Sequence, residues 1–147
     1  IIMIKKILIV EDNGILYQDI KKELVSDYEV YQATSYITAL GYWERENRAF
    51  DCIVLDLQIN PIGLDCVEND KYTPYIGYAV LEAFAQNMNS EEETLLRKKI
   101  IIYSGYAQDF INDNRKFNVN HLEILHKRGN SIKDLIRTIK KVCSKQN

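Results

Sequence analysis

The sequence predicts an α/β fold in which helices cover both faces of a parallel β-sheet. Five short segments are apolar or rich in β-branched residues, as in strands that lie in a sheet covered on both sides. Segments with the spacing of amphipathic helices separate these strands. A strand–helix unit repeated five times implies right-handed crossovers and a layered α/β domain.

The predicted strands differ in strength. Four of them are strongly apolar. The remaining one, which is the second along the chain, is more polar. In chain order they are KILIV (6–10), YEVYQA (28–33), CIVLD (52–56), KIIIYS (99–104) and LEILHK (122–127).

The gaps between the strands carry helical spacing. Leu16, Ile20 and Leu24 recur every fourth residue, and the last helix follows a cap at Ser131 or Asn130. We predict an exposed helix end or loop for residues 89–98. The other helical patterns are centred on residues 39–43, 80–84, 106–117 and 132–143.

Length and composition place the chain among ordinary globular domains. Its 147 residues suit one domain, and 46% are hydrophobic and 27% charged. The net charge of -2 argues against direct nucleic-acid binding. Three cysteines without a CxxC pair favour reduced thiols in the cytoplasm. The apolar N-terminus is too short to span a bilayer, so we expect no membrane contact. Neither nucleotide-binding glycine motif is present.

Polar residues follow four of the predicted strands where each strand ends. In an open parallel sheet these carboxyl ends meet at one edge, where ligands bind. A buried acid at this edge requires a partner. Two acids stand at the end of the first strand, and the third, fourth and fifth strands end in an acid, a hydroxyl and an amine: Glu11, Asp12, Asp56, Ser104 and Lys127.

These motifs together resemble the receiver domain of two-component response regulators. The resemblance covers nearly the whole chain and implies a flavodoxin-like three-layer sandwich, with a doubly wound, five-stranded parallel sheet of order 2-1-3-4-5. It implies a single receiver domain over 1–147, with an extended loop at about 59–74. The carrying stretches are ILIVEDN (7–13), DCIVLDLQ (51–58), IIYSGYA (101–107) and ILHKRG (124–129).

The resemblance implies a Mg²⁺ site. Asp12, Asp56 and the backbone carbonyl of Gln58 would bind the metal directly, and Glu11 would act through water. Mg²⁺ suits this role because it prefers hard oxygen ligands and screens the charges of an acid and a phosphoryl group.

The resemblance also assigns the chemistry. Asp56 would accept a phosphoryl group from a histidine kinase or a phosphotransfer protein. Lys127 would pair with a phosphoryl oxygen, and Ser104 would donate a hydrogen bond to another. The chain would then be a self-phosphorylating acceptor, not a turnover enzyme, that switches binding to a downstream protein partner, and homodimerisation stays open.

Two other functions remain open. A pseudo-receiver would use the same fold as a phosphorylation-independent interaction module. A phosphatase-type hydrolase would need an acid two residues after its nucleophile, where Gln58 stands.

The sequence departs from the receiver pattern at three places. Arg128 replaces the proline that follows the lysine, so we expect a trans peptide bond there. Ile124 replaces an aromatic residue, a change that points to an altered switch or to a role for Tyr103 or Tyr106. The segment at about 59–74 is longer than usual; either it is a tolerated surface insertion or it recognises a partner.

Overall fold

The computed structural model describes residues 3–145 and has a five-stranded parallel sheet of order β2-β1-β3-β4-β5. The predicted fold class and strand order are confirmed. The strands are β1 (Lys5–Val10), β2 (Tyr28–Ala33), β3 (Cys52–Leu55), β4 (Ile100–Ser104) and β5 (Glu123–His126). The helices are α1 (Gly14–Leu24), α2 (Tyr36–Arg45), α3 (Cys66–Tyr72), α4 (Ile76–Phe84), α5 (Ser90–Arg97), α6 (Ala107–Ile111) and α7 (Ile132–Ser144).

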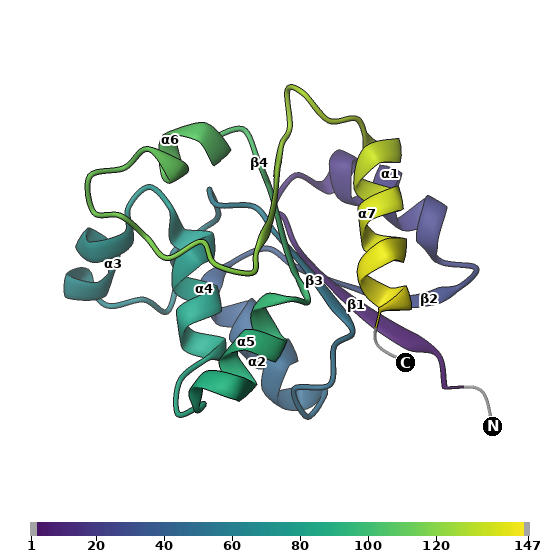
Figure 1. The fold of residues 1–147 in the computed structure, drawn as a ribbon, viewed down its shortest axis with the longest axis horizontal. Helices are drawn as coiled ribbons and strands as arrows, with labels where there is room; N and C mark the ends of the chain where they lie inside the picture. Colours follow the sequence, from purple (N-terminus) through teal and green to yellow (C-terminus); the bar gives the residue numbers. More distant parts are fainter. Residues whose placement is uncertain (1–2, 146–147) are drawn as a thin grey trace.

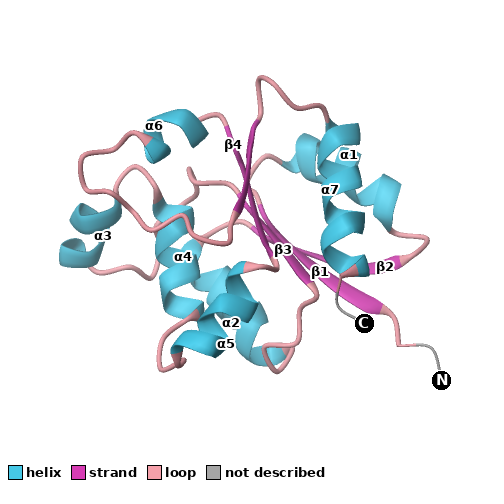
Figure 2. Cartoon of the chain, in the orientation of Figure 1, coloured by secondary structure: helices cyan, strands magenta, loops and turns pink. Residues whose placement is uncertain are grey.

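The sheet separates two apolar cores. Figure 1 shows α1 and α7 on one face and α2, α4 and α5 on the other, and Figure 2 shows the strands passing between these two groups. Alternate residues of β1 enter opposite cores, as the twofold period of a strand requires: Ile7 and Ile9 pack under α1 and α7, whereas Leu8 and Val10 face α2 and α4. None of the helices within residues 3–145 is long and apolar enough to cross a membrane.

Three connecting segments differ from the sequence-based description. Residues 90–97 form the complete helix α5, because Asn89 and Glu92 make reciprocal capping hydrogen bonds. Helix α3 lies within the segment at about 59–74, where we expect an extended loop, and the Asp65 side chain caps it by accepting from the Glu68 N–H. The helix expected over 106–117 ends at Ile111.

An arginine joins α3 to the connection between α6 and β5. Arg115 Nη1 donates to the carbonyls of Lys71 and Thr73 at the end of α3, each at 3.0 Å. The same guanidinium pairs with Asp113 at 2.8 Å and lies over the ring of Phe117, 4.9 Å from its centre. The α3 segment is therefore fixed to the rest of the domain through residues 113–117.

Gly77 allows α4 to approach the end of β3 closely. Its N–H donates to the carbonyl of Leu57 at 2.9 Å. A Cβ at this position would lie 2.1 Å from the carbonyl oxygen of Asp56, which is impossible without backbone movement. The first turn of α4 therefore packs directly against the backbone that carries Asp56.

We predict that Gly77→Ala destabilises the protein by about 3 kcal/mol, because the new methyl group meets backbone and not a mobile side chain. Gly41→Ala is the matched control: Gly41 is an exposed position within α2 with open space around it. That change should stabilise the protein by about 0.5–1 kcal/mol. Urea unfolding measures both. Equal effects of the two substitutions would contradict the close approach.

The Asp113–Arg115 pair predicts acid sensitivity. Hydrogen bonds from Arg115 lower the pKa of the Asp113 carboxyl from its ordinary value of 3.8 to about 2. The ionised carboxyl therefore stabilises the fold above pH 3.8, and this stabilisation is lost as the pH falls towards 2. Asp113→Asn should lower the melting temperature at pH 6 and lessen its fall below pH 4. Asp109→Asn, at an exposed position of α6, is the control. It should change neither the melting temperature at pH 6 nor its fall below pH 4.

Candidate functional site

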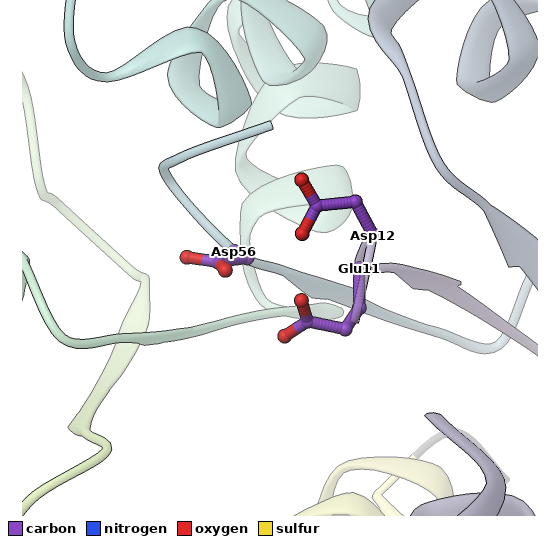
Figure 3. Close-up of side chains that lie close together, drawn as sticks. All are labelled: Glu11, Asp12 and Asp56. Atoms are coloured by element: carbon purple, nitrogen blue, oxygen red, sulfur yellow. The ribbon is translucent and has the colours of Figure 1, made fainter. Parts of the chain in front are cut away.

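Three acids converge at the carboxyl edge of the sheet. Glu11 and Asp12 follow β1, and Asp56 follows β3, the strand that pairs with β1. One carboxylate oxygen from each lies within 4.8 Å of the other two. Figure 3 shows the three carboxylates turned towards a common space. Oxygen donors at this separation are suited to a hard cation such as Mg²⁺.

Lys127 joins two of these acids. Its Nζ lies 2.7 Å from Glu11 Oε1 and 3.0 Å from Asp56 Oδ2. The partner of Asp56 in this structure is thus the ammonium group, whereas the sequence suggested a bound metal. Glu11 and Asp56 are only 3% and 7% exposed, so without this cation both charges would be poorly compensated.

The turn after β5 holds Lys127 in place without a proline. The N–H of Lys127 donates to the carbonyl of Ser104 at 3.1 Å, and the N–H of Arg128 donates to His126 Nδ1 at 3.1 Å. Within residues 3–145 the cis peptide bond is Thr73–Pro74, so the expected trans bond between Lys127 and Arg128 is confirmed.

Backbone N–H groups orient the two buried carboxylates. Asn13 N–H donates to Glu11 Oε2 at 3.0 Å, and Gln58 N–H donates to Asp56 Oδ1 at 3.2 Å. The N–H of Asp56 donates in turn to the carbonyl of Val10 at 2.9 Å. These bonds fix the carboxylates while the third acid, Asp12, remains exposed to solvent.

Burial and charge shift the pKa values in the site. Burial raises the pKa of Glu11, and the charge of Asp56 adds to this rise, while hydrogen bonds from Lys127 and Asn13 oppose it. Burial lowers the pKa of Lys127, but the hydrogen bond to Glu11 and the charge of Asp56 outweigh it, so the net shift is upward. Desolvation is thus the largest cause of the raised pKa of Glu11.

The acids line an open depression, but Ser104 does not reach it. Ser104 is fully buried at the end of β4, where its Oγ accepts a hydrogen bond from the N–H of Tyr106 at 3.1 Å. The depression is lined by Glu11, Asp12, Asn13, Asp56, Gln58, Ile59, Asn60, Pro61 and Lys127.

The two tyrosines beside Ser104 differ in environment. Tyr103 is buried, and its hydroxyl donates to the carbonyl of Asn130 at 2.9 Å. Its ring centre lies 5.8 Å from Lys127 Nζ. Tyr106 is 37% exposed and precedes α6. Tyr103 therefore supports the loop that carries Lys127, and Tyr106 faces solvent at the start of α6.

Three residues that shape the site had no assigned role in the sequence. Gly77 allows α4 to pack closely against the backbone of Asp56. Gln32 Nε2 donates a hydrogen bond to the carbonyl of Glu11 at 2.9 Å. Asn13 both orients Glu11 and caps α1. Only Asn13 carried a signal, since it belongs to the EDN motif and is a preferred capping residue.

Comparison with solved structures shows that the chain has the fold of receiver domains. It matches the non-phosphorylated HemR receiver domain from Leptospira biflexa at 22% identity and a TM-score of 0.65, over 95% of this chain and 94% of that one. The response regulator receiver domain protein from Clostridium thermocellum matches at 18% identity and a TM-score of 0.62, over 97% of each chain.

A third neighbour has a metal in its cleft. The receiver domain of a sensor histidine kinase from Pseudomonas aeruginosa, solved with magnesium coordinated in its active site cleft, is 21% identical. The match covers 97% of this chain and 99% of that one, at a TM-score of 0.64. No protein-family model matches the sequence, and no curated protein does.

We predict that Lys127→Met destabilises the metal-free protein by about 2 kcal/mol at pH 7, because Glu11 and Asp56 lose their shared cation. Without the ammonium group the already raised pKa of Glu11 should rise further. A raised carboxyl pKa in the folded state favours folding as the pH falls, so the deficit should shrink between pH 7 and pH 5. Urea unfolding in a chelator tests this.

Lys140→Met serves as the control, because Lys140 lies on the exposed side of α7. Its effect should be small and independent of pH. A Lys127→Met deficit that stays constant from pH 7 to pH 5 would contradict the assigned role of the ammonium group.

Proposed function

We propose that this chain is a single receiver domain over residues 1–147 that accepts a phosphoryl group on Asp56, in the cytoplasm, from a histidine kinase or a phosphotransfer protein. The carrying observation is that the Asp56 carboxylate opens onto a depression where two further acids and the Lys127 ammonium lie beside it. Receiver domains are signalling modules, and this chain has their fold.

The donor set fits Mg²⁺. Mg²⁺ prefers oxygen ligands from carboxylates and backbone carbonyls, and one carboxylate oxygen from each of the three acids lies within 4.8 Å of the other two. Asp12, Asp56 and the Gln58 carbonyl would hold the ion, with Glu11 acting through water. When bound, the metal would screen the charge of the incoming phosphoryl group.

Asp56, Lys127 and Gln58 have separate roles in the transfer of the phosphoryl group. An oxygen of Asp56 attacks phosphorus, the new P–O bond forms, and the P–N bond of the donor phosphohistidine breaks with its electron pair leaving on nitrogen. Lys127, already 3.0 Å from Asp56 Oδ2, neutralises charge on the transferred group. The Gln58 N–H orients the other oxygen of Asp56.

Ser104 would couple the transfer to partner binding. Ser104 Oγ now accepts a hydrogen bond from the Tyr106 N–H at 3.1 Å and does not line the depression, so a rotation that brings its hydroxyl to a phosphoryl oxygen would change this bond. Tyr106 precedes α6, and the connection from α6 to β5 carries Arg115, which holds the end of α3. A change at Ser104 would thus alter the surface formed by α6 and α3, where we expect the downstream protein to bind.

One observation favours the alternative of a phosphorylation-independent module. Ile124 on β5 has no hydroxyl, so it cannot exchange a polar partner between buried and exposed positions. The convergence of three acids and Lys127 at one open depression favours phosphorylation instead, because partner binding alone does not call for such a cluster. The following experiment distinguishes the two functions.

Incubation with acetyl phosphate and Mg²⁺ should add one phosphoryl group per chain, seen by intact-mass spectrometry. The adduct should disappear with a chelator, with hydroxylamine, which cleaves acyl phosphates, and in Asp56→Asn. Asp19→Asn, on α1 away from the site, should behave as the wild type. A folded wild-type protein that gains no adduct from acetyl phosphate or a panel of phosphorylated kinases, and shows no Mg²⁺ binding by calorimetry, would support the interaction module.

A further inference from the structure

Two buried cysteines from distant parts of the chain meet between the sheet and the last helix. Cys52 begins β3, and Cys143 lies in the last turn of α7. They are 0% and 2% exposed and belong to the same apolar core, and each thiol shifts the pKa of the other. The third cysteine, Cys66, is exposed on α3.

The packing of α7 keeps these thiols together. Leu135, Ile139 and Val142 bury the face of the helix that covers β3 and β4. At the end of the helix, Lys5 Nζ donates a hydrogen bond to the carbonyl of Cys143. Both sulfur atoms are thus carried by packed secondary-structure elements that face the same apolar core.

We propose that Cys52 and Cys143 are a redox pair, oxidised by a hydroperoxide to an intramolecular disulfide that links α7 to β3. In the first step the Cys143 thiolate attacks the peroxide, the O–O bond breaks, and a sulfenic acid and hydroxide form. In the second step the Cys52 sulfur attacks this sulfenic acid and water leaves. Two thiols and one hydrogen peroxide thus give one disulfide and two waters, and two electrons pass to the peroxide.

The environment assigns the two roles. Interaction with the Cys52 thiol lowers the pKa of Cys143, whereas burial raises the pKa of Cys52. Cys143 is therefore the attacking thiolate. A cavity reaches the chain neighbours of both cysteines, Asp51 and Val142, and Lys98, Lys99 and Lys145 also line it. Two acids, Asp51 and Glu123, line the cavity beside these three lysines, so cations outnumber acids there. The cavity brings a small oxidant next to the residues that flank both cysteines.

The redox pair is separate from the phosphoryl site. Cys52 lies at the start of β3, whereas Asp56 follows the end of this strand. Oxidation closes a loop of about 90 residues and restricts the unfolded chain, so it should raise the thermal stability. A reducing cytoplasm would keep the pair as thiols except during oxidation, as is usual for redox-sensing cysteines.

The test uses the full chain with Cys66→Ser, which removes the exposed thiol. After treatment of the folded protein with hydrogen peroxide, denaturation and alkylation, we expect no alkylated cysteine and an intact mass lower by two hydrogen atoms. Non-reducing peptide mapping should join the peptides of Cys52 and Cys143. The melting temperature should rise by about 10 °C and return when a dithiol is added.

The double variant Cys66→Ser/Cys143→Ala is the matched control and should show neither the mass change nor the shift. The peptide map of Cys66→Ser alone decides the question if this control fails to fold. Two alkylated cysteines after peroxide, or a sulfinic acid on Cys143 beside a free Cys52, would overturn the proposal.

Discussion

The ion pair of one lysine with two buried acids holds the site together. The Lys127 ammonium contacts Glu11 after β1 and Asp56 after β3, so it connects the ends of three strands. Two carboxylates this buried cannot both stay ionised side by side unless a cation compensates them. The turn after β5 therefore delivers a cation that compensates both buried carboxylates at this edge of the sheet.

The same contacts create a competition. A divalent ion bound by the acids needs oxygens of Asp56, and Lys127 now occupies one of them, Oδ2. The other oxygen, Oδ1, is held by a backbone N–H of Gln58. Binding of metal would therefore weaken the hold on Lys127 and free the ammonium for the charge that arrives with a phosphoryl group. The ammonium group and a metal ion would each reduce the free-energy cost of burying the carboxylate charges of Glu11 and Asp56.

Much of the fold and of the site could be predicted from local sequence patterns. Continuous apolar runs mark the strands, and the rule that parallel strands present their carboxyl ends at one edge brings Glu11, Asp12 and Asp56 together. The Lys127 contacts could not be predicted in this way, because they depend on distances between residues 11, 56 and 127 that no periodicity encodes. Nor could the buried orientation of Ser104, since one torsion angle decides it.

The segment at about 59–74, which contains α3 and is called the α3 insertion below, shows that segment length alone is a poor guide to function. A long segment costs little conformational entropy, so a passive surface insertion is one of the two alternatives that the sequence leaves open. Yet Arg115 binds two carbonyls at the end of α3, and Tyr72 and Phe117 stack with ring centres 6.5 Å apart. These contacts reach residues that connect α6 to β5, in the part of the chain between Ser104 and Lys127. A displacement of α6 must therefore break these contacts or carry α3 with it, so the insertion is mechanically part of the region that a phosphoryl group on Asp56 would move.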